Sequence, residues 1–167
     1  MKSILLVEDD KDLGATMEER LVKTGLTVVW KLCLKDARQA LDKGIFDLVV
    51  LDVGLPDGSG FEFAKEVASN YLVPFLFVTA ETSAEQRLQG YELGAEEYIP
   101  KPFHLKEFLL RVNHVLANHS LKQQISVQGV VVDFQHLTIN KDGINPVKVS
   151  VKDKKLRFDY ESDLTPA

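Results

Sequence analysis

The sequence predicts an α/β fold: a doubly wound, five-stranded parallel sheet, followed by a small antiparallel β extension. Apolar runs alternate five times with segments of helical periodicity over residues 1–118, a pattern typical of parallel sheets with right-handed crossovers. Polar residues follow several of these runs at the carboxyl end, where open α/β sheets bind ligands. After residue 128 the pattern changes to strict alternation, which predicts the antiparallel extension.

Composition and charge are those of an ordinary soluble chain. The 167 residues are 45% hydrophobic with a net charge of −5, and the single cysteine, Cys33, excludes an internal disulfide and fits a reducing cytoplasm. No apolar run approaches the ~20 residues of a membrane helix, and no signal peptide is visible. We therefore expect a cytoplasmic protein without a membrane partner. The net acidity counts against nonspecific nucleic-acid binding by the whole molecule, although not against a local basic face.

Five apolar runs predict the strands of the parallel sheet. The central run ends in Asp52 and is followed by a Pro-Asp-Gly turn, which is typical of a strand buried on both faces. The predicted strands are 4–7, 26–30, 46–51, 74–80 and 96–99.

Apolar residues recur with helical spacing between these runs. Asp10 is expected to cap the first helix and Gly25 to end it. The last helix has the clearest apolar stripe. The predicted helices are 11–24, 35–43, 60–69, 84–93 and 105–118.

Side chains with acid, hydroxyl and amine groups follow four of the predicted strands. Because the carboxyl ends of parallel strands meet at one edge of the sheet, we expect these side chains to face a common crevice. They are Glu8, Asp9, Asp52, Thr79 and Lys101.

On these segments the chain resembles the receiver domain of two-component response regulators, which implies a flavodoxin-like arrangement of the sheet. The matching segments are ILLVEDD at 4–10, LDVGLPDG at 51–58, VTA at 78–80 and GAEEYIPKPF at 94–103. The resemblance covers about residues 1–118. Together the segments are highly specific, whereas any one of them alone would be weak.

The resemblance implies a phosphorylation site. Asp52 would be the phosphoacceptor, a carboxylate nucleophile that forms an aspartyl phosphate with a phosphoryl group from a sensor histidine kinase. Glu8 and Asp9 would hold Mg²⁺ together with Asp52 and the backbone carbonyl of Gly54, a set of oxygen ligands that suits this ion. No enzyme activity is expected beyond Mg-dependent self-phosphorylation and self-dephosphorylation at Asp52.

Further roles follow from the same resemblance. Lys101 would bind a phosphoryl oxygen, and Thr79 would donate its hydroxyl to another and pull its loop inward. Tyr98 resembles the family's switch aromatic, which turns inward when Thr79 moves; from the residues alone it is a half-buried aromatic of a short strand. The peptide bond before Pro102 would be the family's cis peptide, which the sequence by itself only permits.

A set of charged residues resembles the dimer face of receivers attached to winged-helix DNA-binding domains. Active receivers of that subfamily dimerise through the fourth helix, fifth strand and fifth helix, so the resemblance implies a homodimer on phosphorylation. Across a two-fold axis Arg87 would pair with Glu107, and Glu97 with Arg111. A solvated charged helix face is the alternative. The matching residues are Arg87, Glu96, Glu97, Glu107 and Arg111, with His114 where the subfamily usually has a further arginine.

Several other polar or unusual residues are expected to be structural. Asp57 is interpreted as turn chemistry and Asp10 as a helix cap rather than a metal ligand. Histidines that nothing spaces as metal ligands are expected at the surface, and the single tryptophan and cysteine are expected in packing. These residues are His104, His114, Trp30 and Cys33.

The last fifty residues predict a linker at 119–128 and a β-rich tail at 129–167. The alternation and the Lys141-Asp142-Gly143 hairpin signal predict three or four antiparallel strands. Residues 127–151 also resemble the β-platform that opens the winged-helix output domain. The rest of the tail cannot supply a three-helix core, a recognition helix and a wing, so the platform is truncated or degenerate, or the tail has another task.

Two functions from different classes therefore stand side by side. The first is a phosphorylation switch, in which phosphotransfer to Asp52 changes the face made by the fourth helix, fifth strand and fifth helix. The second is a DNA-binding transcription regulator whose output domain is truncated. A hydrolase of the aspartyl-phosphate type would need a second aspartate two residues after Asp52, where this chain has Gly54.

Overall fold

The computed structural model describes residues 1–122, 124–127, 130–133, 138–141, 144–152 and 155–159. By its contacts the chain divides into two compact units, Met1–Leu116 and Ala117–Ala167.

A parallel five-stranded sheet forms the centre of the first unit. Its strands are β1 (Ser3–Val7), β2 (Thr27–Lys31), β3 (Leu48–Leu51), β6 (Phe75–Thr79) and β7 (Tyr98–Pro100), in the order β2-β1-β3-β6-β7. All neighbouring pairs are parallel. This confirms the predicted fold class. The direction of winding reverses between β1 and β3, and such a switch point opens a crevice at the carboxyl ends of the strands.

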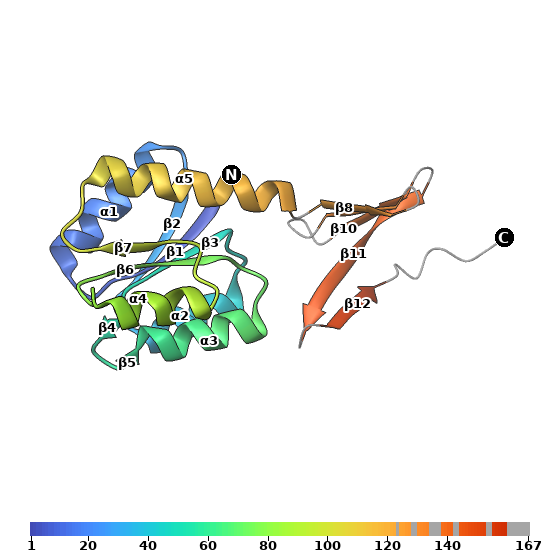
Figure 1. The fold of residues 1–167 in the computed structure, drawn as a ribbon. Coiled ribbons are helices and arrows are strands. Elements are labelled where there is room, and N and C mark those ends of the chain that lie inside the picture. The colour runs from blue at the N-terminus through green and yellow to red at the C-terminus, as the bar shows by residue number, and fades with distance from the viewer. Residues whose placement is uncertain (123, 128–129, 134–137, 142–143, 153–154, 160–167) are drawn as a thin grey trace. The chain divides into compact units, whose positions relative to one another are not determined.

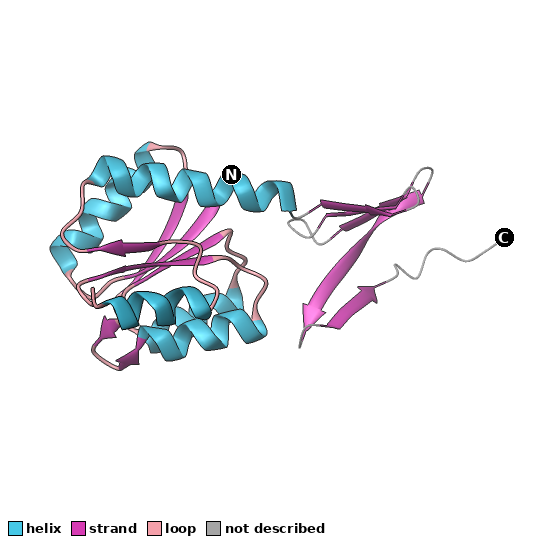
Figure 2. Cartoon of the chain, viewed as in Figure 1, coloured by secondary structure: helices cyan, strands magenta, loops and turns pink. Residues whose placement is uncertain are grey.

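Five helices cover the two faces of this sheet (Figures 1 and 2). α1 and α5 lie on one face, and α2, α3 and α4 lie on the other. The apolar stripes of the helices pack on the sheet, as their periodicity predicts. Their bounds are α1 Lys11–Lys23, α2 Leu34–Lys43, α3 Gly60–Asn70, α4 Ala84–Glu92 and α5 Leu105–Lys122.

The alternation of side chains along the inner strands builds two separate apolar cores. In β1, Leu5 and Val7 are buried in the cluster that contains α2 and α3, whereas Ile4 and Leu6 are buried in the cluster that contains α1 and α5. Successive strand residues point to opposite faces of a sheet, so a strand that is apolar at every position serves both cores.

A short ribbon interrupts the connection from β3 to α3. β4 (Gly54–Leu55) pairs antiparallel with β5 (Gly58–Ser59), with Gly54 opposite Ser59 and Leu55 opposite Gly58. The sequence indicates only a turn here. The ribbon begins two residues after Asp52, at the crevice.

The second unit is an antiparallel sheet in the order β12-β11-β10-β9-β8. Four of the described strands, β9 to β12, lie within residues 129–167 and agree with the predicted three or four, while β8 forms within the predicted linker and α5 continues to Lys122. Regular structure therefore occupies most of the segment 119–128, while the domain limits themselves stay a prediction. The predicted hairpin turn at 142–143 lies outside the described residues. The strands are β8 Gln124–Val127, β9 Val130–Asp133, β10 Thr138–Lys141, β11 Ile144–Lys152 and β12 Lys155–Asp159.

A search of the residues that the structure describes finds no helix long and apolar enough to cross a membrane.

Candidate functional site

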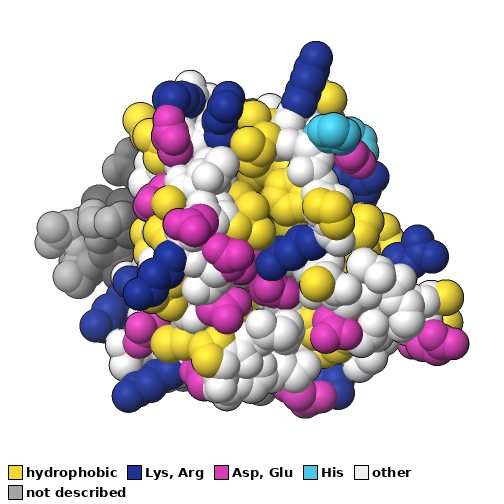
Figure 3. Space-filling view, turned by 90° about the vertical axis from the view of Figure 1, so that its left-hand side faces the viewer, with side chains coloured by type: hydrophobic (Ala, Val, Ile, Leu, Met, Phe, Trp, Pro, Cys, Tyr) yellow, Lys and Arg dark blue, Asp and Glu magenta, His cyan; other side chains and the backbone are white. Residues whose placement is uncertain are grey.

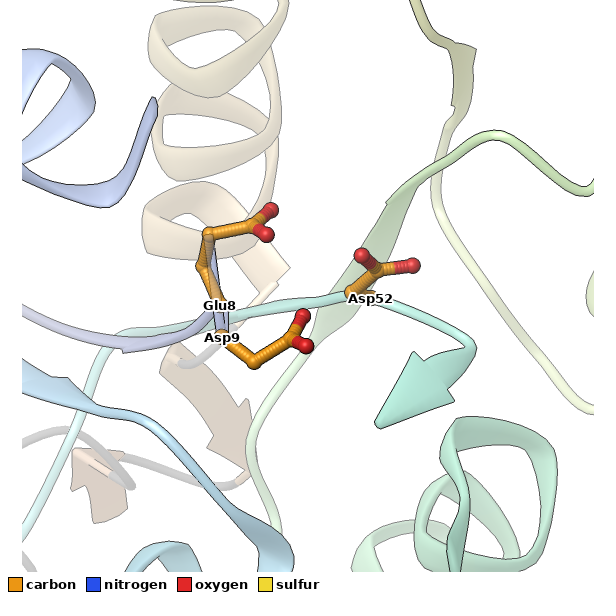
Figure 4. Close-up of side chains that lie close together, drawn as sticks. All are labelled: Glu8, Asp9 and Asp52. Atoms are coloured by element: carbon orange, nitrogen blue, oxygen red, sulfur yellow. The ribbon is translucent and has the colours of Figure 1, made fainter. Parts of the chain in front are cut away.

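Three carboxylates converge at the switch point between β1 and β3 (Figure 4). Glu8 and Asp9 follow β1 directly and Asp52 follows β3, and one oxygen from each lies within 4.8 Å of the others. Glu8 and Asp52 are buried, with 1% and 7% of their surfaces exposed, while Asp9 is exposed. Carboxylates this close repel one another, so a cation stabilises the group. Oxygen ligands with one side open to water fit Mg²⁺.

Lys101 is the positive partner of this acidic cluster. Its Nζ atom lies 2.7 Å from Asp52 Oδ2 and 2.8 Å from Glu8 Oε2. Burial by itself would lower the pKa of Lys101, but the hydrogen bonds and charges of Asp52 and Glu8 raise it above its ordinary value. The amine therefore stays charged. The bond from Lys101 to Pro102 is cis, as the resemblance implies.

Burial acts in the opposite sense on the carboxylate of Glu8. It raises the pKa of Glu8 above the ordinary value, although Lys101 lowers it in part. The ion pair thus favours the charged form of the lysine without fully offsetting the desolvation of the acid. A divalent cation would supply the remaining positive charge.

Thr79 and Tyr98 meet at the backbone of Glu81. Thr79 ends β6 and is buried, and its Oγ1 accepts a hydrogen bond from the Glu81 N–H at 3.1 Å. The Tyr98 hydroxyl donates to the Glu81 carbonyl at 2.5 Å. Glu81 is a link that the sequence does not reveal, because only its backbone takes part.

Tyr98 lies inside the fold rather than half-buried in it. Only 3% of its surface is exposed, and its ring centroid is 5.6 Å from that of Phe77. Gly90 of α4 provides the space, since a Cβ atom there would lie 2.7 Å from Tyr98 Cδ2. Burial raises the pKa of Tyr98 to about 12.

Residues around the cluster hold its backbone in place. The Trp30 indole N–H donates to the Glu8 carbonyl at 2.9 Å. A Cβ atom at Gly60 would lie 2.1 Å from the Asp52 carbonyl, so only glycine lets α3 begin this close to Asp52. The Gly54 N–H lies 3.3 Å from Asp52 Oδ1, and the metal-binding role of its carbonyl stays a prediction.

Among the residues expected to be structural, Asp57 makes contacts beyond the turn in which the sequence places it. Its carboxylate accepts hydrogen bonds from the backbone of α2, a partner distant in sequence. Asp10 caps α1 as predicted, because its Oδ1 accepts from the N–H groups of Asp12 and Leu13. His104 and His114 are exposed.

The predicted dimer face carries ion pairs within one chain. Arg111 Nη1 lies 2.8 Å from Glu97 Oε2, and Arg111 Nη2 lies 2.8 Å from Glu107 Oε1. Arg87 and Glu96 are exposed. Apolar side chains of α4 and α5 are exposed as well, namely Leu88, Tyr91 and Leu110.

A groove of about 610 Å³ adjoins the cluster on the side of α1. Figure 3 shows the side of the molecule that lies to the left in Figure 1. Acidic and basic side chains lie in the middle of this side, next to an area of hydrophobic ones. The groove connects the first turn of α1 with the loop before α5. Its lining residues are Asp10, Asp12, Leu13, Thr16, Lys101, Pro102, Phe103 and Leu105.

Residues 4–113 match the family described as the response regulator receiver domain. Response regulator SaeR of Staphylococcus epidermidis is 32% identical over 165 residues, which are 95% of this chain and 70% of SaeR. Response regulator ArlR of Staphylococcus saprophyticus is 29% identical over 161 residues, 95% of this chain and 71% of ArlR.

Solved structures show the same fold. The non-phosphorylated HemR receiver domain from Leptospira biflexa is 50% identical, with a TM-score of 0.67 over 70% of this chain and 95% of that one. The BeF3-activated DrrB receiver domain is 33% identical, with a TM-score of 0.64 over 70% of this chain and 98% of that one.

Proposed function

Because this chain belongs to the family of response regulator receiver domains, we propose that Asp52 accepts a phosphoryl group from a sensor histidine kinase. The observation that carries the proposal is the position of Asp52 at the end of β3. It lies within a cluster of three carboxylates, with the Lys101 amine 2.7 Å from its Oδ2 atom. A cytoplasmic setting, which the single cysteine favours, belongs to the same proposal.

The chemistry is a displacement at phosphorus. A carboxylate oxygen of Asp52 attacks, a new O–P bond forms, and the P–N bond to the kinase histidine breaks. The leaving imidazole keeps the electron pair of that bond. The attacking group is a carboxylate, which carries no proton to be removed, so the attack needs no general base. In self-dephosphorylation a water oxygen attacks phosphorus and the O–P bond to Asp52 breaks. The Asp52 carboxylate leaves with the electron pair, and inorganic phosphate is released.

Lys101 and a bound Mg²⁺ would supply positive charge where negative charge develops during the transfer. Lys101 would turn from Asp52 Oδ2 toward a phosphoryl oxygen. Glu8, Asp9 and Asp52 would hold Mg²⁺, with the Gly54 carbonyl as a further ligand. When bound, Mg²⁺ neutralises the charge shared by the carboxylates and the phosphoryl oxygens.

Thr79 and Tyr98 would pass the change to the face made by α4, β7 and α5. The Thr79 hydroxyl accepts from Glu81, so its own proton is available to a phosphoryl oxygen. The Tyr98 hydroxyl donates a hydrogen bond to the backbone carbonyl of the same residue, Glu81. A shift of Thr79 would therefore act on the loop before α4 and on the packing of Tyr98. The expected result is a homodimer through this face.

Acetyl phosphate with Mg²⁺ tests the phosphoacceptor directly. We expect intact mass spectrometry to show one added phosphoryl group on the wild type and none on Asp52→Asn. Asp12→Asn, which removes an exposed carboxylate of α1, is the control and should gain the group as the wild type does. A gain on Asp52→Asn, or a wild type that neither gains the group nor binds Mg²⁺, would contradict the assignment.

DNA binding remains a second candidate function. The similarity to SaeR and ArlR covers 95% of this chain, so it extends past the receiver at residues 1–118 into the tail at 129–167. Fluorescence anisotropy with duplex DNA in a salt series distinguishes the two functions. Binding whose logarithm falls linearly with the logarithm of salt concentration would support DNA recognition. Absence of binding at low salt would favour the switch alone.

A further inference from the structure

Helix α2 is fastened to the segment that follows β3 at three points along its length. Two of them join α2 to α3 and to the residue after it: Arg38 forms a two-pronged ion pair with Glu66 of α3 at 2.7 and 2.8 Å, and the hydroxyl of Tyr71, which follows α3, donates to Asp42 at 2.6 Å. The third point is different. It joins the first turn of α2 to the β4–β5 ribbon, which begins two residues after Asp52.

Asp57 forms this third contact from the turn of the ribbon. Its Oδ1 atom accepts from the Leu34 N–H at 2.8 Å, and its Oδ2 atom accepts from the Lys35 N–H at 2.9 Å. The first N–H groups of a helix have no partner within the helix. Cys33 precedes α2 but makes no side-chain capping bond. Asp57, which lies 23 positions after Leu34 in sequence, caps the helix instead.

An apolar contact accompanies the two hydrogen bonds. Gly58, next to Asp57, has a φ of +154°, and a Cβ atom there would lie 3.1 Å from Leu34 Cδ1. The ribbon thus approaches α2 closely with its backbone. Polar and apolar contacts together fix the distance between the turn and the helix.

The same ribbon carries the backbone of Gly54. Gly54 lies opposite Ser59, and the Gly60 N–H donates to the Val53 carbonyl at 2.8 Å. The base of the ribbon is therefore tied to the end of β3, and its tip is tied to α2 through Asp57. Loosening the tip leaves Gly54 supported from one end only.

We propose that Asp57 is a positioning residue of the metal site, because it anchors the ribbon to α2 and thereby fixes the direction of the Gly54 carbonyl. The inference rests on the proposed function, since it assigns that carbonyl as a ligand. Asp57 itself touches neither the cation nor the reacting atoms. Its contribution is to keep the ribbon in the conformation that binds Mg²⁺.

Trp30 gives a direct readout of Mg²⁺ binding. It is the single tryptophan of the chain, and its indole N–H contacts the Glu8 carbonyl at 2.9 Å. Titration of Trp30 fluorescence with Mg²⁺, checked by calorimetry, yields the Kd without any phosphotransfer. We expect Asp57→Ala to raise the Kd about tenfold, as the loss of a residue that orients a metal ligand does. Asp57→Asn, which keeps one acceptor oxygen, should lie between.

Glu66→Gln is the matched control. It weakens the attachment of α2 to α3 but leaves the ribbon contact intact, so its Kd for Mg²⁺ should equal that of the wild type. Linkage requires a reciprocal effect: Mg²⁺ should slow hydrogen exchange at the Leu34 and Lys35 amides of the wild type.

The outcomes separate this inference from the proposed function. A wild type that does not bind Mg²⁺ would overturn the proposed function and the inference with it. If the wild type binds and Asp57→Ala binds equally tightly, the positioning role alone is wrong. Equal weakening by Asp57→Ala and Glu66→Gln would assign the effect to the packing of α2 and also overturn the role. Asp57→Asn answers the question if the alanine variant does not fold.

Discussion

Burial of the Tyr98 phenol makes the free energy of unfolding depend on pH in the alkaline range. Burial raises its pKa to about 12, above the ordinary value of 10 that the unfolded chain would have. The free energy of unfolding that depends on the neutral phenol is therefore complete below pH 10. It is lost progressively as the pH rises toward about 12.

We expect Tyr98→Phe to lose less stability than the wild type across this alkaline range, because phenylalanine keeps the ring but cannot ionise. Urea unfolding on either side of pH 10 measures the difference, and absorbance titration of the phenolates gives the pKa itself. Tyr71→Phe removes another phenol whose pKa is about 12, so absorbance titration of this variant separates the titration of Tyr98 from that of Tyr71. A Tyr98 phenol that titrates near 10 would contradict the buried position.

At the scale of the element, α4 has a glycine where a helix would favour alanine. Gly90 lies in the last turns of α4, and in a helix interior glycine costs about 1 kcal/mol relative to alanine. Lack of space explains the glycine, since a Cβ atom at this position would lie 2.7 Å from the Tyr98 ring and 3.3 Å from the Phe77 ring. The glycine thus determines whether Tyr98 can lie against α4.

Gly90→Ala should displace the Tyr98 ring toward solvent. Overpacking of a filled core costs about 1–3 kcal/mol, which exceeds the gain in helix propensity, so we expect a net loss in the free energy of unfolding. The Tyr98 pKa should move from about 12 back toward 10. Gln89→Ala, at an exposed position of the same helix, should leave the pKa unchanged. An unchanged pKa in Gly90→Ala would show that the core accommodates the methyl group.

At the scale of the whole molecule, the proposed dimer requires an exchange of ion pairs. Arg111 is bonded to Glu97 and Glu107 of its own chain, whereas the dimer would pair Arg111 with Glu97 of a second chain. Surface ion pairs contribute about 0–1 kcal/mol, so the exchange costs little. The apolar residues exposed on α4 and α5 would then supply most of the attraction.

We expect Arg111→Glu to prevent dimerisation of the phosphorylated protein while leaving the added phosphoryl group intact. Sedimentation velocity measures the first and intact mass the second. Lys65→Glu introduces the same change in net charge on α3, away from this face, and should still dimerise. Full dimerisation of Arg111→Glu would place the interface elsewhere.

Sequence alone determined the alternation of the five strands of the parallel sheet with the five helices, and the group of side chains at the crevice. In a parallel sheet every carboxyl end reaches the same edge, so residues that follow β1, β3, β6 and β7 must be neighbours. The structure accordingly brings Glu8, Asp9, Asp52 and Lys101 together. The periodicity of apolar residues also determined which helix faces are buried.

Only the tertiary structure decided which distant groups meet. The local sequence predicts that the carboxylate of Asp57 stabilises its own turn, yet its hydrogen-bond partners are backbone amides of α2. The depth of Tyr98 depends on Gly90, and the link from Thr79 to Tyr98 runs through the backbone of Glu81. Periodicity indicates that a residue is buried, but not which residues it packs against. A hydrogen bond to a backbone group does not depend on the side chain of that residue, so the sequence does not indicate it.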